Sequence, residues 1–564
     1  MEYTASKVWE LYQKGIDYLN KKHLIADTNQ AWDFFCGDQW NGLKSGNITM
    51  PKFDFIHSNV MRLVTIIYSN RLAVTYTDLE GRKELQPIYD MLQTKYLEDY
   101  ERGKEDTLMR TTLKEACITG DGIQFFGHGA DASKVQRLDN TAVLYGDESE
   151  PDIQKQPYII IHQRETVKSV RKQAEKNGLS QAEIDRIVSD SDTNELIGNQ
   201  TEVDESHAAQ NGKVTTCIYM TKNDEGIVGV MRCTKAVAYE PFHELRGGAS
   251  EIDTKQGRKG KGLRLYPILK LSWELRPNDA RGVSHVKKLI PNQIELNKNI
   301  ARIAMASKSF CFPHLAYLEG AITNEEQLDV VGGKIAVQGT DVNEINKMLT
   351  YVQPAQISNI PKQLQDDLLQ VTQELSGSGE NTLGQIELNR VAASAINAVN
   401  ERAESMLDDQ VAMMAQFGED FAALMAELHM VYEPDGFTVE QPVLNPDGQP
   451  SVDEMGNPIM TKVFVTQEIL DKLMPAVRVD ISKENSFNIL ARDKWLDDLL
   501  SNGMIDLKTR VRMSSTGSPI PKNEMLAEIQ RMEAEQQQKM LEQQMMAQPP
   551  APSGGAPQQE APMA

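Results

Sequence analysis

One segment of the 564-residue chain, residues 282–308, combines a helix-forming pattern with an unusual charge balance. Pro291 is suited to a first helical turn, where a missing N–H costs nothing, and isoleucine and methionine residues follow at helical spacing. The pattern predicts a helix over Pro291–Ser307, with Val283–Ile290 as a lead-in. Five basic residues in the segment are opposed only by Glu295, in a chain whose formal net charge is -22. A basic island in an acidic protein indicates a polyanionic partner.

A small insert and a second helix follow this segment. The insert contains three short apolar runs that predict strands, at residues 315–318, 334–337 and 348–352. The chain then returns in a helix predicted over Ser358–Leu375. A glycine-rich polar stretch, Ser376–Gly384, precedes a long helix predicted over Ala392–Tyr432. The spacing of the glycines does not match the G-x-G-x-x-G fingerprint and a helix precedes them, so mobile backbone is the better interpretation than nucleotide binding.

This order of elements resembles the portal proteins of tailed bacteriophages, in which a stem helix, a protruding clip, a returning stem helix, a tunnel loop and a long wing helix follow one another. Three runs carry the resemblance: FFCGDQW at Phe34–Trp40, LIPNQIELNKNIAR at Leu289–Arg302 and SGSGENTLG at Ser376–Gly384. The resemblance covers roughly residues 5–515. Each run alone is less specific than a metal-binding cysteine pattern. The order of the three runs along the chain is what supports the resemblance.

The resemblance implies an α+β protomer with a mixed wing domain, a helical stem, a small α/β clip, a helical crown and a disordered C-terminal tail. The corresponding divisions of this sequence would be the N-terminal part of the wing at 1–281, a stem helix at 282–308, the clip at 309–355, a returning stem helix at 356–376, a tunnel loop at 377–391, the rest of the wing with a long helix and a β hairpin at 392–484, the crown at 485–544 and the tail at 545–564. The tail is rich in Pro, Gly, Ala and Gln, a composition that buries too little apolar surface to order itself.

The resemblance also implies a function without catalysis or cofactors. A homo-oligomeric ring, a dodecamer in the resembling family, would form a channel for packaging and ejecting double-stranded DNA at a vertex of the capsid. Its partners would be the terminase large subunit, which supplies the ATPase, then head-completion and neck proteins, and the major capsid and scaffolding proteins. The protein would be located in the virion, and in the host cytoplasm during assembly.

Five residues are candidates to line the DNA channel: Lys298, Arg302, Lys308, Asn381 and Thr382. The first three lie on the predicted stem helix, and the last two lie in the predicted tunnel loop. An alternative for Lys298 and Arg302 is that they form salt bridges with acidic residues of a neighbouring subunit.

Composition limits the other possibilities. The acidic balance argues against nucleic-acid binding over the whole surface, but not against a channel through which DNA passes without being gripped. No apolar run approaches the ~18 residues that a membrane helix needs, so no membrane association is expected. The 5 cysteines are scattered without a C-x-x-C pair, which favours free thiols in a reducing compartment.

An enzyme and a structural adaptor are the competing hypotheses. We find no H-E-x-x-H, G-x-S-x-G or Walker A motif, and His128 has no second ligand at metal spacing. The adjacent pairs Asp366–Asp367 and Asp408–Asp409 point to different sides of their predicted helices, so neither pair predicts a catalytic site. The basic, glycine-rich segment 254–262 lacks the phosphate-loop pattern and is interpreted as a hairpin tip. A phage or non-viral adaptor or scaffold protein without a DNA channel remains the alternative function.

Patterns elsewhere predict a mixed wing. Helices are expected over residues 5–27, 55–72, 84–118, 167–178 and 486–502. Strands are expected at 123–126, 141–145, 157–162, 437–444, 459–465 and 477–481, with a β hairpin formed by 214–220 and 227–239.

Overall fold

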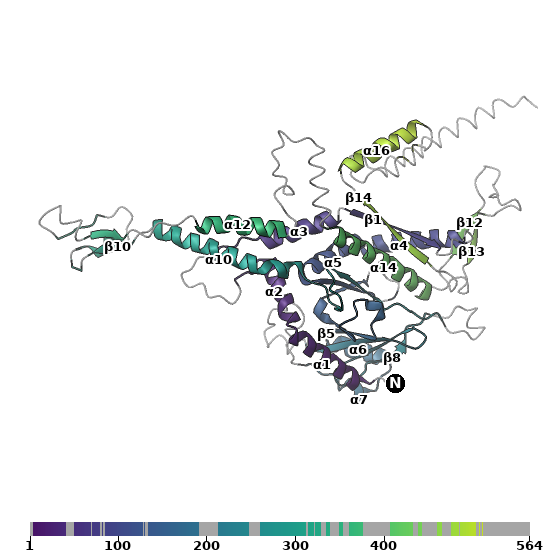
Figure 1. Ribbon diagram of the computed structural model, residues 1–564. Coiled ribbons are helices and arrows are strands. Elements are labelled where there is room, and N and C mark those ends of the chain that lie inside the picture. Colours follow the sequence, from purple (N-terminus) through teal and green to yellow (C-terminus); the bar gives the residue numbers. More distant parts are fainter. Residues whose placement is uncertain are drawn as a thin grey trace, which may run out of the picture. The chain divides into compact units, whose positions relative to one another are not determined.

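The computed structural model has the mixed α+β architecture that the sequence predicts (Figure 1). It divides into two compact units, Met1–Ile481 and Ser482–Ala564. The residues that it describes are 4–40, 50–68, 70–78, 82, 85–127, 129, 134–190, 212–247, 260–311, 314–317, 319–320, 322–328, 334–338, 349–352, 360–375, 407–432, 438–442, 460–464, 475–483, 486–502, 507 and 510.

The prediction of a single helix over residues 5–27 is wrong. Two helices occupy this region, α1 (Ala5–Lys21) and α2 (Leu24–Cys36). His23 separates them with a φ of 57°, in the left-handed region that no continuous α-helix passes through. Phe34 and Phe35, in the last turn of α2, are buried and pack in the main apolar core.

A similar break divides the helix predicted over residues 84–118. Lys104, with a φ of 54°, ends α4 (Gln86–Gly103) and precedes α5 (Glu105–Thr119). The helix predicted over 55–72 also ends early, as α3 (Phe55–Tyr68), because strand β1 (Asn70–Asp78) begins there.

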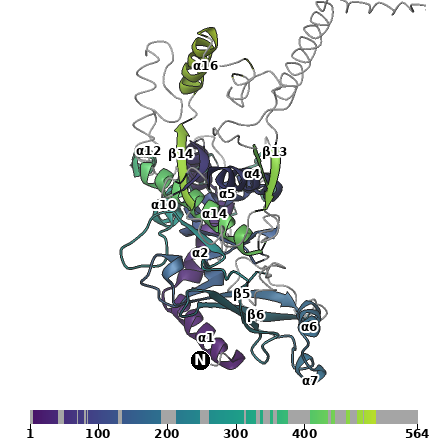
Figure 2. The same cartoon turned by 90° about the vertical axis from the view of Figure 1, so that its right-hand side faces the viewer.

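Five strands form an antiparallel sheet in the order β4-β5-β6-β7-β8 (Figure 2). They are β4 (Val143–Tyr145), β5 (Tyr158–Thr166), β6 (Lys213–Lys222), β7 (Val228–Cys233) and β8 (Glu240–Glu244). The predicted hairpin is confirmed by the pairing of β6 with β7. Its turn is closed by the Asn223 side chain, which accepts hydrogen bonds from the N–H groups of Glu225 and Ile227, and by Gly226 at a φ of 77°.

Both faces of this sheet are buried, which explains its high content of β-branched residues. Alternate side chains along the strands, such as Ile161 and Ile218, enter one apolar cluster with strands β2 (Asp121–Phe125) and β9 (Ile268–Ser272). The others, such as Ile160 and Tyr219, pack against α1 and the start of α2. Two short helices, α6 (Val167–Lys176) and α7 (Gln181–Ile184), cover one end through a separate cluster.

A second sheet joins the first to the helices. Its strand order is β3-β2-β9, from β2 (Asp121–Phe125), β3 (Gln136–Leu138) and β9 (Ile268–Ser272). The long helix α14 (Asp408–Tyr432) packs against β9, and its methionines Met414 and Met425 are buried, as expected for a helix between neighbours. The remainder of the helix predicted over 392–432 lies outside the described residues.

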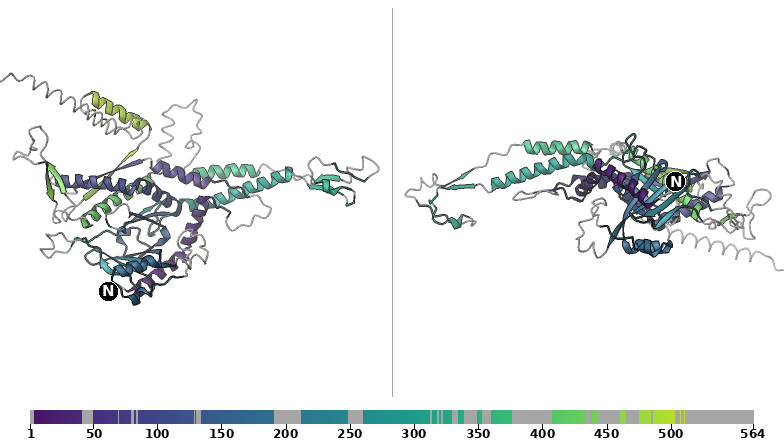
Figure 3. Two further views of the ribbon diagram at one scale, coloured as in Figure 1. Left: turned by 180° about the vertical axis from the view of Figure 1, so that it is seen from behind. Right: turned by 90° about the horizontal axis from the view of Figure 1, so that it is seen from below.

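The central segment forms two helices that lie side by side, α10 (His285–Cys311) and α12 (Ile360–Leu375) (Figures 1 and 3). Between them in the chain, β10 (His314–Tyr317) pairs antiparallel with β11 (Leu349–Val352). The first and third predicted strands of the insert are therefore confirmed. The second run contributes only an isolated bridge between Ile322 and Val337.

The strands predicted at 437–444, 459–465 and 477–481 are confirmed, whereas β1, β3, β8 and β9 were not predicted. Strands β12 (Thr438–Pro442) and β13 (Met460–Phe464) pair antiparallel, and β14 (Pro475–Lys483) pairs with β1. In the smaller unit, α16 (Ser486–Ser501) confirms the helix predicted over 486–502. The predicted tunnel loop 377–391, the segment 254–259 and the tail 545–564 lie outside the described residues.

A buried carboxyl group at the start of α5 leads to a prediction about pH. Glu105 has no accessible surface, and neither of its carboxyl oxygens has a hydrogen-bond partner. Burial raises the pKa of Glu105 from 4.5 to about 8. Between these two values the folded state retains a proton that the unfolded state has released, so stability is lost as the pH rises through this window.

We therefore expect Glu105→Leu to raise the free energy of unfolding by about 3 kcal/mol at pH 7, because each unit of pKa shift is worth about 1.4 kcal/mol. The gain should nearly vanish at pH 4. Denaturant unfolding at pH 4, 5.5, 7 and 8 measures it, with Glu101→Leu on the exposed surface of α4 as the control. A gain that is the same at every pH would contradict the assignment.

Candidate nucleic-acid interface

Helix α10 begins earlier than its sequence predicts. Ser284 caps it, since the Ser284 hydroxyl accepts a hydrogen bond from the N–H of Lys287 at 3.0 Å. Pro291 consequently lies inside the helix and not in its first turn, which corrects the predicted start. The reason is burial: Val286 and Leu289 pack into the main core, and this contact offsets the hydrogen bond that proline cannot make.

The segment just before α10 is fixed by a buried arginine. The Arg281 guanidinium donates two hydrogen bonds to Glu148, at 2.9 and 2.8 Å, and one each to the carbonyls of Asn140 and Val143, at 2.8 and 3.0 Å. The Arg281 side chain also lies over the ring of Tyr145, 4.8 Å from its centroid. Despite burial, the Glu148 carboxylate raises the pKa of Arg281, so the guanidinium stays charged.

A close contact between two glycines completes this anchor. The N–H of Gly282 donates to Asp121 at 2.9 Å, and a Cβ atom at Gly282 would lie 2.2 Å from the carbonyl oxygen of Gly120. Next to them, the Nε2 atom of the half-buried His285 lies 3.0 Å from the amide oxygen of Asn59. Burial lowers the pKa of His285 to about 4, so its imidazole is neutral at pH 7. The start of α10 is therefore held against α3, α5 and β2.

Amide side chains attach α10 to its neighbours. Toward α12, Asn292 donates to the hydroxyl of Thr372 at 3.2 Å and Asn299 donates to the carbonyl of Pro361 at 2.5 Å. Toward the segment before α3, Asn297 donates to Gln39 at 2.6 Å. The asparagines of the run LIPNQIELNKNIAR thus form hydrogen bonds at buried or partly buried positions. The sequence analysis did not identify these residues, although Asn292 and Asn299 lie seven residues apart, on one side of a helix, and such spacing is a usable signal.

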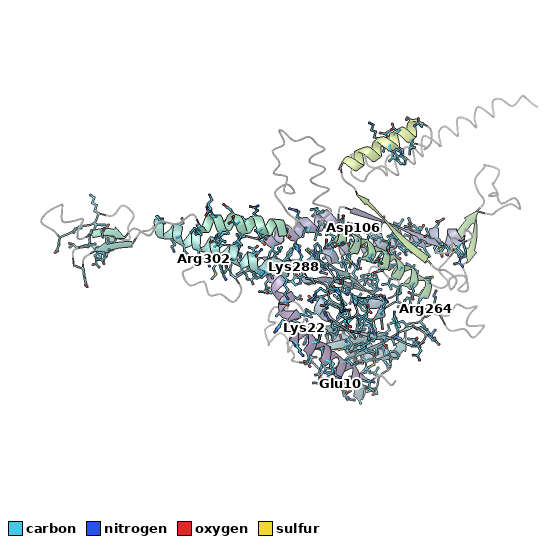
Figure 4. All side chains as sticks on the ribbon, viewed as in Figure 1. Glu10, Lys22, Asp106, Arg264, Lys288 and Arg302 are labelled. Atoms are coloured by element: carbon cyan, nitrogen blue, oxygen red, sulfur yellow. The ribbon has the colours of Figure 1, made fainter. Side chains whose placement is uncertain are left out.

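Two of the basic residues in this segment are neutralised by distant acids. Lys287 pairs with Asp27 on α2, and Lys288 pairs with Glu274 in the chain between β9 and α10. Figure 4 marks Lys288 near the start of α10 and Arg302 in its outer part. The expectation that Glu295 is the only opposing acid is therefore wrong for the inner part of the helix.

The outer part of α10 retains a surplus of positive charge. Lys298 and Arg302 share one carboxylate, that of Glu295, at 3.9 and 2.9 Å, and their side chains are 49% and 54% exposed. Lys308 is exposed, and no described carboxylate lies within salt-bridge distance of it. The other two predicted channel residues, Asn381 and Thr382, lie outside the described residues. The structure brings three of the five candidates onto one helix.

Metal ligands and thiols are the reactive groups considered next. Among them there is no group of three or more His, Cys, Asp or Glu side chains that could hold a metal ion, and His128 lies outside them. Burial raises the pKa values of the Cys117, Cys217 and Cys233 thiols, which makes them poor nucleophiles. None of the described helices is long and apolar enough to cross a membrane.

Comparison with models of known protein families found no match, and comparison with curated protein sequences found no significant one. The structure is an α+β chain with a pair of antiparallel helices, α10 and α12. The exposed side of α10 is basic, and the part of the chain that connects the two helices forms a small two-stranded sheet.

Proposed function

We propose that this protein is the portal protein of a tailed bacteriophage, a subunit of a ring-shaped channel through which double-stranded DNA is packaged and ejected. The observation that carries the proposal is the order of elements α10, β10–β11, α12 and α14. This order matches stem helix, clip, returning stem helix and wing helix in the family that the sequence resembles. The amide contacts between α10 and α12 support a stem made of two paired helices.

In this proposal the stem consists of residues 282–308 and 356–376, the clip of 309–355, and the wing of 1–281 and 392–484. The crown is 485–544, followed by the tail. The clip would dock the terminase large subunit during packaging and the neck proteins afterwards. Assembly would require the major capsid and scaffolding proteins, and the finished ring would be part of the virion.

The exposed cations of α10 are the proposed contacts with DNA or with a neighbouring subunit. Lys298, Arg302 and Lys308 would lie in the stem, and Asn381 and Thr382 would reach furthest into the channel. A channel with few cations in an acidic protein would not retain DNA, because each neutralised phosphate adds salt-dependent affinity.

The experiment that tests the proposal measures the mass and shape of the purified chain. We expect native mass spectrometry and negative-stain images to show closed rings of about twelve subunits with a central hole, the size known for the resembling family. Globular dimers that form no ring, even with co-expressed scaffolding protein, would contradict the proposal and favour the adaptor without a DNA channel.

A further inference from the structure

Helix α6 presents a row of lysines that no described acid neutralises. Lys168, Lys172 and Lys176 are spaced i, i+4 and i+8, so they lie on one side of the helix, about 6 Å apart along its axis. All three are exposed, because the opposite side of α6, with Val170 and Ala174, packs against the end of the five-stranded sheet (Figure 2). Among the described residues, no carboxylate lies within salt-bridge distance of any of the three. We call Lys168, Lys172 and Lys176 the lysine row.

The charge of α6 is unusual for its position in the helix. The helix has four cations and one acid, Glu175, a net of +3. Its first turn contains Lys168 and no acidic residue, although the partial positive charge of a helix N-terminus favours an acid there. The Arg171 guanidinium donates to the carbonyl of Ile187, at 3.1 and 2.8 Å, and so keeps its full charge. Positive charges are therefore gathered here without compensation, which indicates an anionic partner.

An acidic segment joins the described chain at two points beside this helix. The segment is residues 191–211, which lie outside the part of the chain that the structure describes. It has no lysine or arginine, and its acids are Asp192, Glu195, Glu202, Asp204 and Glu205. On its two sides, the N–H of Asp190 donates to the carbonyl of Lys213 at 3.2 Å. The N–H of Val167, the first residue of α6, donates to the carbonyl of Gly212 at 2.8 Å.

An open hollow connects one of these points with the lysine row. It has a volume of about 750 Å³, and its lining includes the cations Lys168, Arg171 and Lys172, the single acid Glu175, and Gly212. Gly212 is the residue that follows the acidic segment in the chain. Residues 191–211 span about 70 Å when fully extended, whereas the lysine row covers only about 12 Å of the helix. The segment is therefore long enough to reach every lysine of the row.

We infer that the lysine row is a docking surface for residues 191–211 of the same chain. A single exposed ion pair contributes little. Here five carboxylates are joined at both ends beside three lysines, and such tethering gives an effective concentration on the order of millimolar. An external polyanion would have to displace the segment to reach α6. This contact forms within one chain and does not depend on the proposed ring.

Carbodiimide crosslinking tests the contact directly. The reagent activates a carboxylate, a neighbouring amine attacks it, and an amide bond joins the two side chains as a urea leaves. We expect mass spectrometry of the full-length chain to identify amides between residues 191–211 and the lysine row. In a mixture of isotope-labelled and unlabelled chains, each crosslinked pair of peptides should carry one isotope only, because both partners belong to one chain.

The reactivity of the lysines provides a second measurement with a matched control. One variant replaces the five acids of the segment by amides: Asp192→Asn, Glu195→Gln, Glu202→Gln, Asp204→Asn and Glu205→Gln. The control makes the same change at five exposed acids of the insert and of α12: Glu319→Gln, Glu325→Gln, Glu326→Gln, Asp366→Asn and Asp367→Asn. Both variants lose the same charge, and circular dichroism establishes that each is folded.

A carboxylate beside a lysine favours the charged amine, and only the neutral amine reacts with an acetylating reagent. We therefore expect the lysine row to be acetylated about two- to fivefold faster in the first variant, the effect of an exposed ion pair, and at the wild-type rate in the control. The difference should disappear in about 1 M salt, where the Debye length falls to about 3 Å.

Three results would overturn the inference. Crosslinks that join labelled to unlabelled chains would make a second copy the partner of the lysine row. Equal acetylation rates in the wild type and both variants would show that the acids of the segment do not reach the row. Protection of the row by added double-stranded DNA alone would make nucleic acid its partner. Each of these results leaves the portal proposal standing, since that proposal is tested by the formation of rings.

Discussion

Replacing Arg281 by methionine is expected to lower the free energy of unfolding by about 3–5 kcal/mol, the range found when one partner of a buried ion pair is removed. The methionine side chain fills similar space, but it leaves the Glu148 carboxylate and the carbonyls of Asn140 and Val143 without their donors. Chemical denaturation followed by far-ultraviolet circular dichroism measures the loss.

Two controls separate the buried pair from a general effect of losing charge. Lys14→Met removes a cation whose salt bridge with Glu10 is exposed on both sides, and it should cost far less than Arg281→Met because solvent screens the pair. The double variant with Arg281→Met and Glu148→Met should recover part of the loss, because it leaves no uncompensated buried charge. If Arg281→Met costs no more than Lys14→Met, the anchor that we assign to Arg281 does not exist.

Gly120→Ala is expected to cost about 2–4 kcal/mol, from the combined effects of overpacking and backbone strain. The Cβ atom would lie 2.3 Å from the carbonyl oxygen of Gly282, a backbone atom that no side-chain rotation can move. Gly120 also has a φ of 105°, which L-amino acids rarely adopt. The same unfolding measurement applies.

A glycine elsewhere in the chain distinguishes the two effects. Gly226 has a φ of 77°, but a Cβ atom there would have no neighbour within 4 Å. Gly226→Ala should therefore cost only the conformational strain, about 1 kcal/mol. Equal losses at Gly120 and Gly226 would show that the contact with Gly282 contributes nothing.

The helices and strands were largely predictable because their apolar periodicity is strong. The hairpin of β6 and β7, the strand pair β12–β13 and helix α12 lie within a few residues of the predicted positions. The breaks at His23 and Lys104 were not predictable, since both residues adopt left-handed φ values without being glycine or asparagine. Chain direction at such positions is decided by tertiary packing, which overrides local propensity.

The candidate site was predictable in part for a related reason. Three exposed cations on α10 could be read from their helical spacing. The partners of Lys287 and Lys288 could not, because Asp27 and Glu274 approach them only in the folded chain. The amides of α10 were missed because their role is to satisfy buried hydrogen bonds, which no charge pattern reports.

Proline inside α10 has a mechanical consequence for the helix. Because Pro291 has no N–H, the carbonyl of Lys287 lacks its usual helical donor, and one backbone hydrogen bond fewer opposes bending at this level. Before this level the start of α10 is held by the contacts of Arg281, Gly282 and Ser284. Beyond it, Asn292 and Asn299 bond to α12, and Gln293 and Asn297 bond to Phe53 and Gln39. A load applied at β10 and β11 is therefore expected to bend α10 more readily at this turn than at turns where every backbone hydrogen bond is present.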